Sequence, residues 1–196
     1  MFHPLYNLDP YDVILASASP RRSELLKMLD ISFRVDTSYP VEEIVPENTP
    51  AEIVPGYLSR LKAEGYPLEP GDMKLVIAAD TVVILDDEVI GKPLNLEGAT
   101  AILAKLQGRT HRVVSGVTIR TFDKSETFSS LSEVEFAPLT PEEIAYYVDT
   151  YRPLDKAGAY GIQEWIGAAA IKGIKGSFYN VMGLPVHRLY QSLKQY

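Results

Sequence analysis

The segment formed by residues 75–85 constrains the fold most, because it is apolar at every position except Asp80 and Thr81. A run of aliphatic residues this dense is typical of a buried strand, and it predicts either one long strand or two strands that meet at Asp80. An ionised carboxylate in such surroundings is costly unless a metal ion or a cationic partner compensates its charge. Catalytic carboxylates of α/β proteins also tend to project from strand ends. Because unpaired buried carboxylates are rare, we favour a functional role for Asp80 over a structural one as the cap of a strand.

The rest of the chain alternates strand-like and helix-like patterns. A second apolar run at residues 13–16 predicts a buried strand, and helical spacing of apolar residues follows at 23–29. Further strands are expected at 33–36, 88–90, 112–120 and 127–136, with short ones in the glycine-rich segment 158–183. Further helices are expected at 49–64, 96–106, 140–150 and 185–194. Such a mixture, without internal repeats, predicts an α/β or α+β protein with a mixed sheet.

Two of these helices carry start signals. Thr49 and Thr140 are each followed three residues later by a glutamate, which is the spacing of a capping box. In the first case Pro55-Gly56 lies inside the expected helix, where proline should either kink the helix or delay its start.

Composition limits the classes of function. The chain has 196 residues, of which 46% are hydrophobic and 23% charged, as expected for one globular domain or two small lobes that share a cleft. The net charge of −7 disfavours general nucleic-acid binding, so a phosphate site requires a local cluster of Lys and Arg. The absence of cysteine excludes disulfides, thiolate zinc sites and a thiol nucleophile. No signal peptide and no apolar run of the ~20 residues needed by a membrane helix is present, so we expect a cytoplasmic protein without a membrane partner.

The turn at residues 17–22 is the first candidate site. Ser19 is a favourable N-cap and Pro20 suits the first helical position, so backbone N–H groups near Ser17 and Ser19 should face an anion. Arg21 and Arg22 add to the positive end of the helix and destabilise it unless an anion binds there. A phosphate site and a solvated basic turn remain equally open from this turn alone.

Other candidate residues are scattered along the chain. Lys62 and Lys92 could converge on the same anion, although a single lysine usually lies at the surface. The acidic pair Glu42-Glu43 could join Asp80 in holding a hard cation, with a solvated acidic loop as the alternative.

The glycine-rich segment 155–163 is the last candidate. Its small residues let the backbone approach a ligand closely, and Gln163 can read a base edge through paired donor and acceptor groups. The alternative is a flexible loop.

Together these pieces resemble the Maf family of nucleotide pyrophosphatases, from Val13 to the C-terminus. The matching segments are Ile14-Leu15-Ala16-Ser17-Ala18-Ser19-Pro20-Arg21-Arg22, Lys62-Ala63, Ala79-Asp80-Thr81, Gly91-Lys92-Pro93, Asp155-Lys156-Ala157-Gly158-Ala159-Tyr160-Gly161-Ile162-Gln163, and Gly176-Ser177-Phe178 with Gly183-Leu184-Pro185. The resemblance implies one domain over residues 13–196, preceded by an N-terminal extension at 1–12. Its implied fold is α/β and two-lobed, with an extended mixed β-sheet and a central cleft, similar to inosine triphosphate pyrophosphatases.

The resemblance also implies an activity. The chain looks like the branch that hydrolyses dTTP and UTP, or modified pyrimidine nucleotides, to the monophosphate and pyrophosphate. By the matching motifs, Asp80 carries over as the general base, and Arg21, Thr81 and Gln163 carry over as residues of substrate choice. A homodimer is implied, as is a divalent cation, Mg²⁺ or Mn²⁺, which Asp80 would hold together with Glu42 or Glu43.

In this reading a triphosphate is held by the cations of the cleft and by the serine turn. The expected phosphate-binding residues are Ser17, Ser19, Arg21, Arg22, Lys62 and Lys92. Two rival functions remain open. One is a nucleotide-binding regulator of septum formation or cell division with incidental turnover, because the family has been linked to inhibition of septum formation. The other is an inosine or xanthosine triphosphate pyrophosphatase with the same chemistry.

Overall fold

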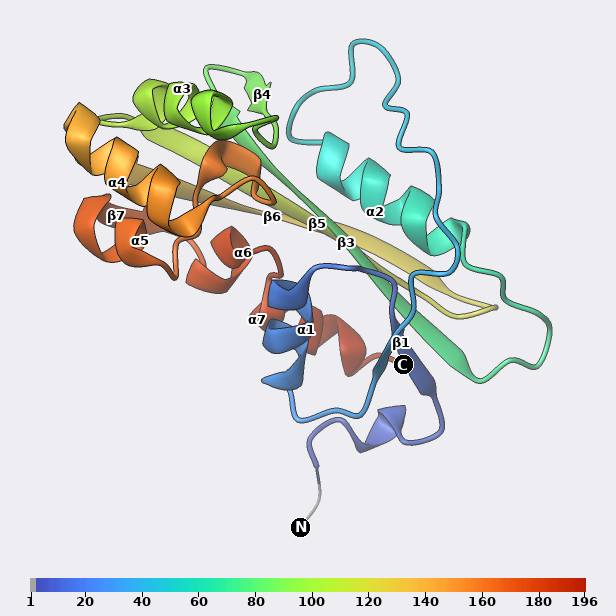
Figure 1. The fold of residues 1–196 in the computed structure, drawn as a ribbon. Helices are drawn as coiled ribbons and strands as arrows, with labels where there is room; N and C mark the ends of the chain where they lie inside the picture. Colours follow the sequence, from blue (N-terminus) through green and yellow to red (C-terminus); the bar gives the residue numbers. More distant parts are fainter. Residues whose placement is uncertain (1–2) are drawn as a thin grey trace. The chain divides into compact units, whose positions relative to one another are not determined.

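The computed structural model describes residues 3–196, which form a mixed α/β fold with a seven-stranded sheet (Figure 1). The chain divides into two compact units. The first comprises the residues up to Asp80 with 115–130 and 183–196, and the second comprises 81–114 and 131–182. Three strands pass from one unit into the other: β3 (Lys74–Leu85), β5 (Thr110–Arg120) and β6 (Ser125–Phe136). The strand order is β2-β1-β3-β5-β6-β7, and β4 pairs with β3.

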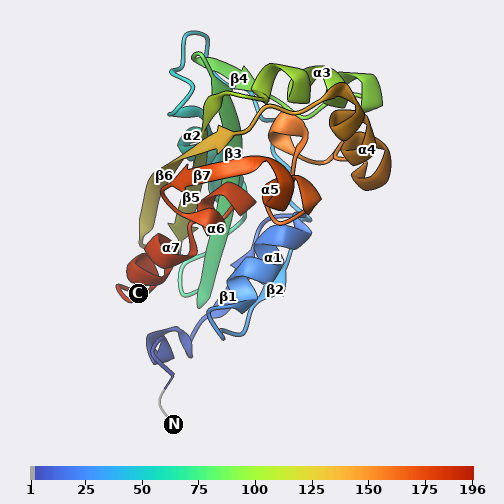
Figure 2. The same ribbon diagram turned by 90° about the vertical axis from the view of Figure 1, so that its left-hand side faces the viewer.

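The first unit is built on a parallel pairing of strands. Its other elements are η1 (Tyr6–Leu8), β1 (Asp12–Leu15), α1 (Pro20–Lys27), β2 (Arg34–Val35), α2 (Val54–Glu64) and α7 (Val186–Leu193). Strand β1 runs parallel to both β2 and β3, with Ile14 opposite Val76 in the register. Both side chains are fully buried, as the apolar runs predicted. Helix α1 lies beside β1 and β2 (Figure 2) and buries Leu25 and Leu26.

The expected strand at residues 75–85 is confirmed as one long strand. Asp80 lies inside β3 and not at its end, so the alternative of a strand-capping Asp is wrong. A turn at Asp86-Asp87, both with positive φ, leads into β4 (Glu88–Ile90), which pairs antiparallel with β3.

The expected capping box at Thr49 is wrong. Helix α2 begins at Val54, its N-cap is Ile53, and no side chain caps it. The Thr49 hydroxyl instead donates to the Pro46 carbonyl at 2.7 Å. Proline is tolerated only in the first helical turn, where its missing N–H costs no hydrogen bond, so Pro55 delays the start of the helix. The remainder of the helix, including Lys62, is uninterrupted.

The second unit packs helices around a separate apolar core. Its other elements are α3 (Leu96–Leu106), α4 (Pro141–Tyr151), η2 (Ala157–Ala159), α5 (Trp165–Ala170), β7 (Ile171–Lys175) and α6 (Phe178–Met182). Helix α3 packs against α4 and η2. The fully buried side chains here include Leu103, Leu106, Phe136, Tyr147 and Ile166.

Local signals explain the second unit only in part. The capping box at Thr140 forms completely, because the Thr140 hydroxyl accepts from the Glu143 N–H and the Glu143 carboxylate accepts from the Thr140 N–H. The short strands expected in the glycine-rich segment are wrong except for β7, because the segment also forms two short helices, α5 and α6. Strand β7 pairs antiparallel with β6.

The N-terminal segment is part of the first unit from Leu5 onward. Leu5 and Leu8 are buried, and the Asn7 side-chain amide donates to the Leu193 carbonyl at 2.8 Å. Of the predicted extension at 1–12, Met1 and Phe2 lie outside the described residues. Within residues 3–196, no helix has the length and apolarity needed to cross a membrane.

Candidate functional site

Asp80 lies just beyond the carboxyl end of the parallel pairing between β1 and β3. The last paired residues are Leu15 and Ile77, and the Ala16 N–H also donates to the Ile77 carbonyl at 2.9 Å. The predicted anion-binding turn, residues 17–22, follows β1 directly. The turn and Asp80 are therefore at the same edge of the sheet, which is the edge where α/β proteins bind ligands.

Asp80 is held by a lysine. The Lys62 Nζ donates to Asp80 Oδ1 at 2.7 Å, and both side chains are largely buried, with 19% and 15% of their surface exposed. Lys62 comes from the last turn of α2. Its ammonium also lies 3.0 Å from Glu43 Oε2, so one cation links two carboxylates from separate parts of the first unit.

The turn after β1 is organised by the Ser17 hydroxyl. Ser17 Oγ accepts from the Ser19 N–H at 3.3 Å and from Arg22 Nη1 at 3.1 Å. Arg22 Nε donates to the Gly183 carbonyl at 3.0 Å. Ser19 occupies the N-cap position of α1 as expected, but its side chain makes no capping bond.

Arg22 carries a partly buried charge close to Asp80. Burial lowers the pKa of its guanidinium, Asp80 opposes that change, and Arg21 lowers the pKa further. Glu43 also acts on Arg22 electrostatically. The first unit thus brings together five predicted site residues, Ser17, Arg22, Glu43, Lys62 and Asp80, in one network of contacts and charges.

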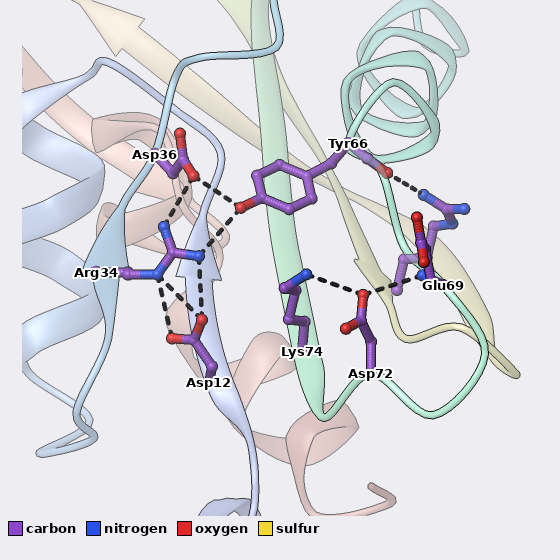
Figure 3. Close-up of polar contacts among 8 residues, drawn as sticks. Asp12, Arg34, Asp36, Tyr66, Glu69, Asp72 and Lys74 are labelled. Atoms are coloured by element: carbon purple, nitrogen blue, oxygen red, sulfur yellow. Dashed lines mark hydrogen bonds and ion pairs between the residues drawn. The ribbon is translucent and has the colours of Figure 1, made fainter.

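The acidic segment after β2 is anchored at its start by a polar cluster (Figure 3). Arg34 pairs with Asp12 at 3.0 Å and with Asp36 at 2.8 Å. The Tyr66 hydroxyl donates to Asp36 Oδ2 at 2.7 Å and accepts from Arg34 Nη2 at 3.1 Å. Hydrogen bonds from Tyr66 and then Arg34 hold the pKa of Asp36 well below its usual value. The Tyr39 ring packs edge-on against Tyr66, so this segment is fastened beside the end of α2.

Two carboxylates near Lys62 are candidate ligands of a divalent cation. Among the residues that the structure describes, no group of three or more His, Cys, Asp and Glu side chains could hold a metal ion. Asp80 and Glu43 nevertheless converge on one cationic centre, the Lys62 ammonium. Glu42 is exposed and belongs to no ion pair found in residues 3–196. Because Mg²⁺ is usually bound by one or two carboxylates together with substrate phosphates, the pair Asp80 and Glu43 fits such an ion.

The second unit holds three further predicted site residues, whereas Ser19, Arg21 and Glu42 belong to the first unit. Thr81 follows Asp80 in β3, Lys92 is exposed after β4, and Gln163 is exposed after η2. The last two belong to neighbouring segments, because the Gly158 N–H donates to the Gly91 carbonyl at 3.2 Å. Gly158 has φ of +72°, and a Cβ there would lie 2.9 Å from the Val83 side chain, so only glycine fits this approach.

Two sets of residues that the structure brings together were not among the predicted site residues. One is the anchoring cluster of Asp12, Arg34, Asp36 and Tyr66, and the other is a buried group near Gln163 formed by Tyr147, Lys156 and Glu164. Lys156 lies within a motif that the sequence singled out, but its partners lie outside it. An aspartate or tyrosine without a local partner carries no signal that would identify these contacts.

Comparison with known proteins shows full-length relatives. A family model described as Maf-like protein matches residues 12–196. The chain is 49% identical to a protein of Bacteroides thetaiotaomicron named dTTP/UTP pyrophosphatase, over 97% of this chain and 99% of the relative. It is 52% identical to a protein of Porphyromonas gingivalis with the same name, over 98% of each. The structure of a HAM1 protein from Coxiella burnetii shares the fold alone, with a TM-score of 0.51 and 17% identity over 95% of this chain and 100% of that one.

The family model and these relatives each span nearly the whole chain, and the motifs that organise the Lys62–Asp80 network lie inside the matched range. This protein therefore belongs to the Maf family.

Proposed function

We propose that the protein hydrolyses dTTP and UTP to the nucleoside monophosphate and pyrophosphate. The observation that carries this proposal is the Lys62 bridge between Asp80 and Glu43, located at the same sheet edge as the serine and arginine turn. A carboxylate and several cations beside one another suit the hydrolysis of a triphosphate. The names of the relatives supply the substrate class.

In the proposed reaction a water molecule attacks the α-phosphorus. Its oxygen bonds to that phosphorus while the bond to the bridging oxygen of the β-phosphate breaks, and pyrophosphate leaves. Asp80 accepts the proton of the water as general base. Because Lys62 engages Oδ1, the proton goes to Oδ2, and the lysine fixes the orientation of the carboxylate. Arg21, Lys62 and the N-terminal turn of α1 hold phosphate oxygens, and Arg22 and Ser17 keep that turn in shape.

A divalent cation belongs to this proposal through Asp80 and Glu43. When bound there, it supplies positive charge to the phosphate oxygens and lowers the pKa of a bound water. The proposal further includes Lys92 as a phosphate ligand, Thr81 and Gln163 as residues of base selection, a homodimer and a cytoplasmic location.

The test is a panel of nucleoside triphosphates, scored for pyrophosphate release with and without Mg²⁺ and Mn²⁺. The proposal expects multiple turnovers with dTTP and UTP and little activity after chelation of the metal. A preference for inosine or xanthosine triphosphate would reject the pyrimidine assignment. At most one turnover per protein molecule would favour a nucleotide-binding regulator instead.

A further inference from the structure

The turn that presents Gln163 rests on a buried ion pair in the second unit. Lys156 is 9% exposed, and its Nζ lies 3.2 Å from Glu164 Oε1 and 2.7 Å from Asp155 Oδ1. Glu164 is itself largely buried, with 18% of its side chain exposed. Glu164 directly follows Gln163, so the ion pair holds one end of the turn.

A tyrosine from α4 joins both ends of this turn. The Tyr147 hydroxyl donates to Glu164 Oε2 and accepts from the Gly161 N–H at 2.9 Å. Tyr147 is fully buried, and burial raises the pKa of its hydroxyl, which keeps the donor proton in place at neutral pH. The hydroxyl therefore links the residue two positions before Gln163 to the residue after it.

Close packing restricts the turn at residues 161–164 to one backbone conformation. The Glu164 N–H donates to the Gly161 carbonyl at 3.0 Å, which closes the turn. A Cβ on Gly167 would lie 1.7 Å from the Ile162 carbonyl oxygen, and a Cβ on Gly161 would lie 2.8 Å from the Glu164 carboxyl carbon. Neither position has room for a side chain, so the turn cannot shift without breaking these contacts.

Gln163 is the exposed residue at the centre of this held turn. Buried ion pairs contribute little net stability, because their attraction barely offsets the loss of hydration. They can instead favour one conformation over others. We propose that Tyr147, Glu164 and Lys156 are positioning residues that fix the Gln163 backbone and thereby set the discrimination among nucleotide bases. This inference rests on the proposed function, in which Gln163 contacts the base.

The test compares Tyr147→Phe with Gln163→Ala. Tyr147→Phe removes only the hydroxyl, and we expect the ratio of kcat/KM for dTTP to that for dCTP to fall about tenfold, through KM more than kcat. Gln163→Ala should cause a similar loss, and the double variant should lose no more than either single variant. Tyr146→Phe is the matched control, because this neighbouring tyrosine is exposed and packs on Trp165.

A second readout is independent of activity. Hydrogen exchange of the amides at 161–164 should accelerate in Tyr147→Phe and stay unchanged in Tyr146→Phe. If Tyr147→Phe fails to fold, Glu164→Gln gives the same readouts, because it removes the charge that faces Lys156 and keeps an oxygen for Tyr147. Unchanged hydrogen exchange in Tyr147→Phe would overturn the inference. So would wild-type discrimination between dTTP and dCTP in Tyr147→Phe, if Gln163→Ala abolishes that discrimination. A wild-type protein that releases no pyrophosphate from dTTP or UTP would reject the proposed function, while the exchange result would still decide whether the turn is held as inferred.

Discussion

Lys62 Nζ lies 2.7 Å from Asp80 Oδ1 and 3.0 Å from Glu43 Oε2, so a single ammonium joins the end of α2 to the middle of β3 and to the acidic segment after β2. Besides holding phosphate oxygens, the lysine thus has two roles toward the carboxylates in the proposed reaction. It orients the carboxylate that accepts a proton, and it limits the negative charge that would otherwise build up between two carboxylates.

Replacing Lys62 with methionine separates these roles. Without the ammonium, Asp80 and Glu43 face each other uncompensated, which should strengthen their attraction for a divalent cation. We expect turnover of dTTP to fall by about 10²-fold and the Mg²⁺ concentration for half-maximal activity to fall several-fold. Steady-state pyrophosphate release across a Mg²⁺ titration measures both. Lys105→Met, an exposed lysine of α3, serves as control, and an unchanged metal requirement in Lys62→Met would contradict the prediction.

Glu42 and Glu43 provide a matched pair of neighbours. Both side chains are exposed, but among the described residues only Glu43 pairs with Lys62, at 3.0 Å. Glu43→Gln should therefore raise the Mg²⁺ concentration for half-maximal activity by about tenfold, and Glu42→Gln should leave it within about twofold of wild type. The same metal titration decides the matter. Equal effects of the two substitutions, or a larger effect at Glu42, would show that the ligand assignment is wrong.

The buried His111 should make the stability of the second unit sensitive to acid. It is 1% exposed, its Nε2 lies 2.7 Å from the Tyr160 hydroxyl, and burial lowers its pKa to about 4. In the unfolded chain His111 takes up a proton at about pH 6.5. The contribution of the neutral, buried His111 to the free energy of unfolding is therefore fully present above that pH and is lost as the pH falls toward 4. The loss attributable to His111 should be about 3 kcal/mol over that range.

Urea unfolding of wild type and His111→Gln at several pH values between 7 and 4 measures this contribution. The variant should show a shallower decline of the unfolding free energy with falling pH. His187→Gln, at an exposed position in α7, should decline like wild type. A His111→Gln curve parallel to that of wild type would refute the assignment.

Sequence patterns predicted the helices whose capping residues and apolar spacing lie within a single segment. The Thr140 capping box forms because both of its partners are three residues apart, and α3 has the range 96–106 that its apolar spacing predicted. The Thr49 pattern is equally local but failed. Pro55 can be accommodated only in the first turn of a helix, so the helix cannot begin as early as Thr49. This restriction outweighed the capping signal.

The candidate site was predictable to the extent that its residues carry a motif. Asp80 stood out as the lone acid of an apolar run, and the turn at 17–22 stood out as a basic helix start. The choice of Glu43 over Glu42 depends on how the segment after β2 is anchored by Tyr66 and Asp36, which no local pattern reveals. The Tyr147 bond to Glu164 joins α4 to the glycine-rich segment and likewise exists only after folding.

The most direct test of the account is the rate of pyrophosphate release from dTTP and UTP by Asp80→Asn. The variant should fold, bind the nucleotide with near wild-type affinity and turn over about 10²- to 10⁴-fold more slowly, because the amide cannot accept the proton while its oxygen can still accept from Lys62. Asp123→Asn, an exposed aspartate of the turn between β5 and β6, should retain full activity. Near-normal pyrophosphate release by Asp80→Asn would contradict the assignment of Asp80 as the general base.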